Sequence, residues 1–193
     1  DELALAQKDP SQWLSPSDRQ NVAEGKRDFY RAIDAGFFRN VDTSPKLAWL
    51  EYLSGDTERA VKRLAIAADY QTGQSTALSL YYRGAILNRS GRFDEAITSL
   101  DQALAERPDL SLALEEKGES LWQLGRKGEA IAVWNDAVKS NDRLVLSNYF
   151  LAATASNGEE TATYAQQAEK VTTQDRDFHW MVAQLMPNTG MKD

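Results

Sequence analysis

The sequence predicts an all-α solenoid in which short helix–turn–helix units stack in series. Residues 77–110 and 111–144 are two copies of one 34-residue pattern and are identical at eleven positions. The shared positions are mostly small or apolar, and the apolar residues within each expected helix are spaced three, four or seven apart. A unit this short cannot bury a core by itself, so it must pack against further copies. This architecture favours binding over catalysis.

These residues resemble the tetratricopeptide repeat, a 34-residue helix–turn–helix unit with small residues at positions 8, 20 and 27. The first copy has Gly84 at position 8, Gly91 at the turn, Ala96 at position 20 and Ala103 at position 27. The second copy has Gly118, Gly125, Ala130 and Ala137 at the same four places. The first copy ends with Pro108 at the position where the family often has Pro, but the second copy has Asp142 at the equivalent position. Position 7 is basic in both copies (Arg83, Lys117), where the family usually has Leu. The resemblance implies a right-handed α-solenoid with N- and C-terminal flanking helices.

The glycines have a physical reason that is independent of the family. A Gly inside a helix costs about 1 kcal/mol relative to Ala, so Gly84 and Gly118 indicate that two helix axes approach closely there. Gly91 and Gly125 follow apolar-periodic helices and suit a left-handed C-terminal cap. The alternative is an ordinary helical bundle with chance self-similarity.

The N-terminal part is expected to comprise an arm over residues 1–14, with a short helix at Leu3–Lys8, and then a long helix. Ser15 is a good N-cap and Pro16 suits the first turn. This helix should run to Ala35 and end at Gly36. It is expected to bury one apolar face, made of Val22, Phe29, Tyr30 and Ile33.

A single solenoid domain is predicted over residues 15–186, with about 3.5–4 repeats at 41–74, 77–110, 111–144 and 145–174. The first is divergent: Ala48, Gly55 and Ala60 match the next copy at a spacing of 36. In the last, Ala152 supplies the small residue at position 8. A capping helix is expected at 175–186, followed by a tail at 187–193.

Composition excludes several functional classes. The net charge of −7 arises entirely within residues 93–160, and no Lys/Arg run is present, so nucleic acid and anionic membranes are poor partners. No apolar run approaches 18 residues, which argues against direct membrane insertion. With no cysteine and one histidine, His179, we predict no catalytic residues, metal site or cofactor, and no enzyme. The pairs Glu115–Glu116 and Glu159–Glu160 are interpreted as solvated faces.

The chain opens with Asp1 rather than Met, which favours a leader, an anchor or a further domain upstream. We therefore favour the soluble, periplasmic or lumenal part of an exported or membrane-anchored bacterial protein. The compartment itself is left open.

The resemblance also implies a concave groove, lined by the first helix of each unit at positions 2, 5, 9, 12 and 13. Carried across to this sequence, the candidate partner-binding residues are Trp49, Tyr52, Leu78, Tyr81, Asn88, Arg89, Leu112, Glu115, Glu119, Trp122, Gln123 and Tyr149. The set is aromatic and apolar with acids on one wall. Some of these rings could instead fill the seam between neighbouring repeats.

The function predicted is a non-enzymatic module that binds a partner peptide or protein segment, apolar or basic in character, as a scaffold or assembly factor for a larger complex. One alternative is a self-associating oligomer in which a sister chain's N-terminal arm, Asp1–Trp13, fills the groove. A second alternative is the regulatory domain of an enzyme or of a membrane-anchored protein.

Overall fold

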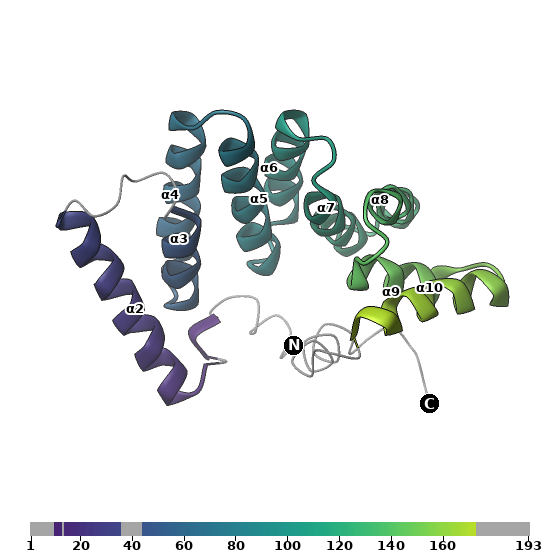
Figure 1. Ribbon diagram of the computed structural model, residues 1–193, viewed down its shortest axis with the longest axis horizontal. Coiled ribbons are helices and arrows are strands. Elements are labelled where there is room, and N and C mark those ends of the chain that lie inside the picture. The colour runs from purple at the N-terminus through teal and green to yellow at the C-terminus, as the bar shows by residue number, and fades with distance from the viewer. Residues whose placement is uncertain (1–9, 13, 36–43, 173–193) are drawn as a thin grey trace.

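The computed structural model describes residues 10–12, 14–35 and 44–172. Within these ranges the chain forms α-helices, one short 3-10 helix (η1, Pro10–Gln12) and no strand. Consecutive helices pack on one another along the chain, and Figure 1 shows them arranged as an arch. The predicted all-α solenoid is confirmed.

Four helix pairs make up the solenoid and are built in the same way. They are α3 (Ser44–Leu53) with α4 (Thr57–Tyr70), α5 (Gln74–Arg89) with α6 (Phe93–Glu106), α7 (Ser111–Gln123) with α8 (Lys127–Ser140), and α9 (Val145–Thr154) with α10 (Gly158–Thr172). The first helix of each pair also contacts the first helix of the next, so α3, α5, α7 and α9 form one continuous layer. Figure 1 shows α7 toward the inside of the arch and α8 outside it. The candidate groove residues belong to this inner layer.

The two helices of a repeat approach most closely at Gly84 and Gly118. A Cβ added to Gly84 would lie 2.6 Å from Leu100 Cγ, and one added to Gly118 would overlap the Trp134 indole, with Cε2 at 2.7 Å. Leu100 and Trp134 occupy the same repeat position and are fully buried. The close approach inferred from the two glycines is confirmed.

Gly55, Gly91 and Gly125 each follow the first helix of a repeat with a positive φ, of 87°, 72° and 76° respectively. At Gly91 the backbone N–H donates to the Asn88 carbonyl and the next N–H, of Arg92, donates to the Leu87 carbonyl, both at 2.9 Å. Because a left-handed residue followed by this pair of bonds is the Schellman cap, the expected caps at Gly91 and Gly125 are confirmed.

The hydrophobic core falls into two clusters that share α7. The first cluster extends from α3 to α6 and reaches Ala113 at the start of α7. The second is centred on Leu121, Trp134 and Phe150, with Tyr164 of α10 packed against it. The Trp134 and Phe150 rings are stacked with centroids 4.4 Å apart. The two ends of α7 therefore belong to different clusters.

The basic residues at repeat position 7 join α5 and α7 to α6. Arg83 Nη1 donates to Ser99 Oγ at 2.9 Å, and Lys117 Nζ lies 2.6 Å from Asp101 Oδ1. Ser99 and Asp101 both lie on α6. Position 7 thus makes a polar contact within a repeat at Arg83 and between repeats at Lys117.

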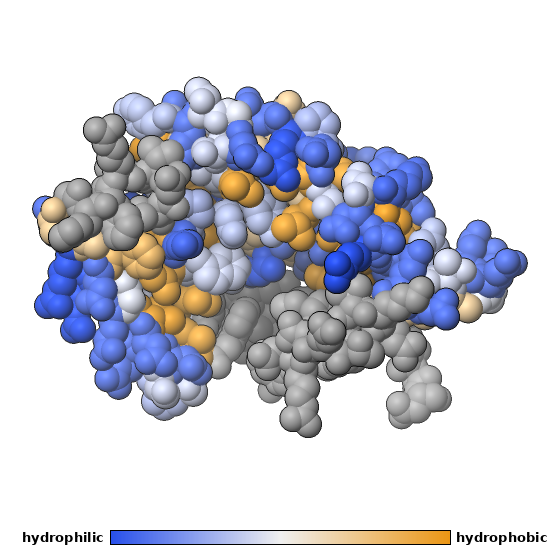
Figure 2. All heavy atoms as spheres, in the orientation of Figure 1, coloured by the Kyte–Doolittle hydropathy of each residue, from blue (hydrophilic) through white to orange (hydrophobic). Residues whose placement is uncertain are grey.

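The helix α2 (Pro16–Asp34) packs against α3 at the N-terminal end of the described stack, through both polar and apolar contacts. Ser15 caps it as expected, because its Oγ accepts the Asp18 N–H at 3.1 Å. Glu51, which is fully buried, accepts the Tyr30 hydroxyl at 2.5 Å and two bonds from Arg63 at 2.8 Å each. Figure 2 shows hydrophobic surface where α2 meets α3.

The expectation that α2 buries four apolar residues is correct only for Val22. Phe29, Tyr30 and Ile33 are partly exposed, because among the described elements α2 packs mainly against α3. The expected helix at Leu3–Lys8, the cap at Gly36, the capping helix 175–186 with His179, and the tail lie outside the described residues.

The close approach at Gly118 leads to a stability prediction. We expect Gly118→Ala to lower the free energy of unfolding by about 1–3 kcal/mol, because the new methyl must displace the buried Trp134 ring. Gly128→Ala is the matched control: Gly128 also lies in a helix, and no atom lies within 4 Å of its added Cβ. That control should be neutral or stabilising by up to about 1 kcal/mol. Urea unfolding followed by circular dichroism measures both, and equal effects would contradict the packing role of Gly118.

Candidate partner-binding groove

The expected groove residues lie on the inner-layer helices but differ in exposure. Leu112 and Gln123 are exposed, whereas Tyr52 and Asn88 are buried. The other residues are partly exposed, namely Trp49, Leu78, Tyr81, Arg89, Glu115, Glu119, Trp122 and Tyr149. The accessible part of the set is thus smaller than the sequence suggests.

Arg89 is central among the candidate groove residues, because it connects three inner-layer helices. Its guanidinium carbon lies 5.3 Å from the centroid of the Trp49 ring on α3, within the range of a cation–π contact. Its Nη1 donates to Glu116 Oε1 on α7 at 3.0 Å and to the Ala85 carbonyl at 2.9 Å. Burial alone would lower the pKa of Arg89, but Glu116 and Glu119 outweigh burial and raise it.

Asn88 is committed to the contact between α5 and α7. Its Nδ2 donates to Glu116 Oε2 at 3.0 Å and to the Glu116 carbonyl at 3.1 Å. Its Oδ1 accepts the Ser120 hydroxyl at 2.8 Å. With only 3% of its surface exposed, Asn88 offers little to a partner.

Glu115 and Glu116 correct one sequence interpretation, since this pair is not a solvated face. Glu116 is 8% exposed and bonds to α5, whereas Glu115 Oε2 accepts the Ser147 N–H at 2.8 Å and its hydroxyl at 2.9 Å on α9. Neighbouring helix positions point in different directions, and α7 has an inner-layer helix on each side. Glu159 and Glu160 are exposed as expected.

Glu119 differs from Glu115 and Glu116, because its carboxylate accepts no hydrogen bond from any described residue. The residue as a whole is partly exposed and lies one helical turn beyond Glu115 and Glu116. Burial, together with the charges of Glu116 and Glu115, raises the pKa of Glu119 to about 7 against the opposing effect of Arg89. Burial likewise raises the pKa of Glu115, although the Ser147 bonds oppose it. The carboxylates of Glu115, Glu116 and Glu119 therefore all interact electrostatically with the same guanidinium, that of Arg89.

Trp122 packs against the second core cluster. Its ring centroid lies 5.7 Å from that of Trp134 and 6.2 Å from that of Phe150, and Lys127 Nζ lies 4.9 Å from it. Tyr149 also adjoins this cluster, with its ring 6.4 Å from Phe150. Both rings thus contribute to the seam between repeats.

The structure brings Trp49, Tyr81 and Arg89 together with Glu115 and Glu119. The Glu116 and Arg89 charges both act on the pKa of Tyr81, which burial raises, so the Tyr81 hydroxyl lies near them. Sequence reasoning missed Glu116 as a member of this group. The sequence feature that could have identified Glu116 is the single arginine among the candidate groove residues, Arg89, which is followed one repeat later by a helix rich in acidic residues.

A family model described as tetratricopeptide repeat matches residues 46–111 and 89–144, which together span just over half of the chain. The chain belongs to the tetratricopeptide repeat family. No curated protein matches it. Tetratricopeptide repeats suggest a protein–protein interaction module, and members of the family are generally not enzymes.

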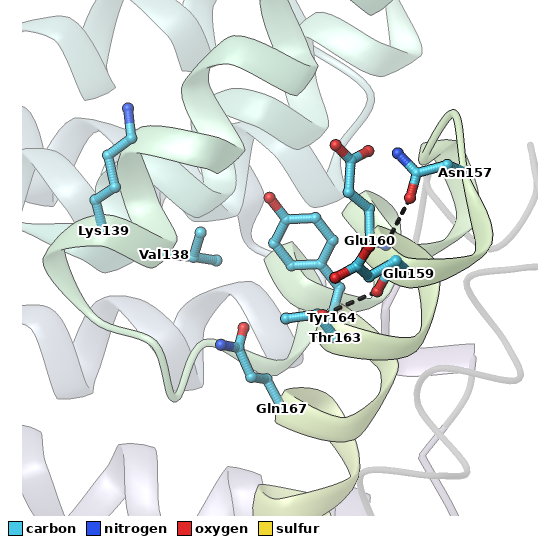
Figure 3. A pocket seen from close by; sticks show the side chains of 8 residues that line it. All are labelled: Val138, Lys139, Asn157, Glu159, Glu160, Thr163, Tyr164 and Gln167. Carbon is cyan, nitrogen blue, oxygen red and sulfur yellow. Dashed lines mark hydrogen bonds between the residues drawn. The ribbon is translucent and has the colours of Figure 1, made fainter.

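Two surface pockets of about 500 and 480 Å³ lie away from the groove of this tetratricopeptide repeat protein. The first, between α8 and α10, has Lys139 on one side and Tyr164 and Glu160 on the other (Figure 3). The second lies beside α4 and includes Arg59 and Tyr70. Neither is lined by an expected groove residue.

Residues 10–12, 14–35 and 44–172 contain neither a candidate metal cluster nor a candidate membrane-spanning helix. No group of three His, Cys, Asp or Glu side chains there could hold a metal ion. No helix in the same ranges has the length and apolar character needed to cross a membrane.

Asn88 provides a stability prediction for the inner layer. Asn88→Ala should lower the free energy of unfolding by about 1–3 kcal/mol, because the buried Glu116 Oε2 loses its donor and the Ser120 hydroxyl loses its shorter hydrogen bond. Gln123→Ala changes an exposed groove position and should stay within about 0.5 kcal/mol of the parent. Chemical denaturation of the two variants is the measurement. A loss no larger for Asn88→Ala than for Gln123→Ala would contradict this role.

Glu119 provides a pH prediction. Its pKa is higher in the folded chain than the usual 4.5, so the folded chain holds this proton more tightly than the unfolded chain. The resulting stabilisation is complete below the unfolded pKa and is lost as the pH rises through about 7. Below about pH 4.5, Glu119→Gln should therefore have the same free energy of unfolding as the parent. Above about pH 7, its free energy of unfolding should exceed that of the parent by more than about 1 kcal/mol.

Urea denaturation across this pH range measures the difference between Glu119→Gln and the parent. Glu106→Gln, an exposed residue at the end of α6, is the control with the same change of charge. Its difference from the parent should not grow with pH. A difference for Glu119→Gln that is equally flat would contradict the prediction.

Proposed function

We propose that this chain is a non-enzymatic scaffold or assembly factor that holds a segment of a partner protein in the groove of its inner layer. The observation that supports this most strongly is the arrangement around Arg89. Partly exposed aromatic rings from α3 and α5 lie beside a carboxylate wall on α7. Aromatic rings contribute a large share of the free energy of many protein interfaces.

The partner segment is apolar or basic in character. Arg89 is already paired with Glu116, so its charge is not available to an acidic ligand. Glu115 and Glu119 would repel such a ligand. An apolar segment with basic residues complements both the rings and the carboxylates.

Selection from a random peptide library displayed on phage tests the proposal without a known partner. We expect the parent protein to enrich peptides that bind it at micromolar concentration in fluorescence anisotropy. Tyr81→Ala and Leu112→Ala should each weaken these peptides by about tenfold, or about 1.4 kcal/mol. Tyr70→Ala removes an aromatic residue that is 83% exposed on α4, outside the groove, and should leave affinity unchanged.

Thermal unfolding of each variant controls for loss of the fold. Failure to enrich any peptide, or equal loss of binding in the groove variants and in Tyr70→Ala, would contradict the proposed function. Light scattering of the full chain and of a chain that starts at Ser15 checks the rival occupant. If only the full chain is an oligomer, the groove holds a sister chain's arm.

A further inference from the structure

We propose that Glu119 binds a lysine or arginine side chain of the partner segment, an assignment that rests on the groove function proposed above. The cation would enter between the aromatic residues of α3 and α5 and the carboxylates of α7. Binding at Glu119 would set which segments the groove accepts.

The hydrogen bonds of the three carboxylates distinguish Glu119 from the other two. Both oxygens of Glu116 accept bonds, one from Arg89 and one from Asn88. Glu115 accepts two bonds from Ser147. Glu119 accepts none from the described residues, so its carboxylate is the one left for a donor that arrives with a partner.

A second polar group, near Arg89, also lacks a hydrogen bond within the described part of the chain. Tyr52 is 1% exposed, and its hydroxyl oxygen is buried without a partner. Its ring lies 5.5 Å from the Trp49 ring, over which Arg89 is placed, and the Arg89 charge opposes the rise in the Tyr52 pKa that burial causes. A buried hydroxyl without a partner is unfavourable.

The charges around this point favour a cation over an anion. The groups that act on Glu119 are Arg89 from α5 and the neighbouring carboxylates Glu115 and Glu116 from α7 itself. With all of them ionised, the local charge is negative, and the one guanidinium is already bonded to Glu116. An incoming ammonium or guanidinium group compensates this charge, and its aliphatic stem can lie along the rings of Trp49 and Tyr81.

Binding of this cation is coupled to a proton. A positive side chain beside Glu119 favours the ionised carboxylate, so the proton that Glu119 holds in the free protein must leave. Since the pKa of Glu119 is about 7, affinity for a cationic segment should rise by about tenfold from pH 6 to pH 8. A neutral segment should show no such rise.

The test uses two acetylated octapeptides as probes, one of alternating Leu and Lys and one of alternating Leu and Gln. We expect the Lys probe to bind the full chain at least tenfold more tightly than the Gln probe near pH 8. Glu119→Gln should weaken the Lys probe by about tenfold, leave the Gln probe unchanged and abolish the dependence on pH. Isothermal titration calorimetry in buffers of different ionisation enthalpy measures the proton released.

Glu106→Gln is the matched control, because it removes one negative charge from an exposed site outside the groove. If it weakens the Lys probe as much as Glu119→Gln does, the attraction is general electrostatics and the assignment is overturned. If Tyr81→Ala weakens both probes while Glu119→Gln weakens neither, the groove binds partners but Glu119 does not bind the cation. If no groove variant affects either probe or any selected peptide, the proposed function fails as well.

Discussion

The fold depends on the missing side chains at Gly84 and Gly118. Each glycine lets a buried residue of the second helix, Leu100 or Trp134, occupy the space that a Cβ would need. This contact sets how closely the two helices of a repeat can approach. Because each pair touches only its neighbours, the position of every later pair depends on it. The inner-layer contacts between α3, α5 and α7 follow from the same spacing.

The elements that could be predicted from the sequence are those where packing or backbone conformation restricts the residue type. Recurrent glycines in helices and at caps predicted the helix pairs and their turns, because a close approach or a positive φ excludes most other residues. The exposure of α2 could not be predicted in the same way. Its apolar pattern resembles that of a fully packed helix, whereas within the described residues it packs mainly against α3.

The candidate site was predicted less completely, because it depends on side chains that meet across repeats. The groove face followed from the resemblance, but the pairing of Asn88 and Arg89 with Glu116 joins residues 28 and 27 positions apart. No local sequence pattern shows which candidate groove residues are hydrogen-bonded to a neighbouring repeat and so are not free to bind a partner. The interpretation of Glu115–Glu116 as a solvated face failed for this reason. The same contacts leave Glu119 as the carboxylate with no such pairing.

The division of the core at α7 has a consequence for cooperativity. Ala113 belongs to the N-terminal cluster and Leu121 to the C-terminal one, so α7 is the shared boundary between the halves. The apolar contacts that couple the two halves involve this helix and Ile97 of α6, which packs against the C-terminal cluster. Loosening it would let the halves melt as separate units, each with its own tryptophan reporter: Trp49 beneath Arg89 in one, and Trp134 stacked on Phe150 in the other.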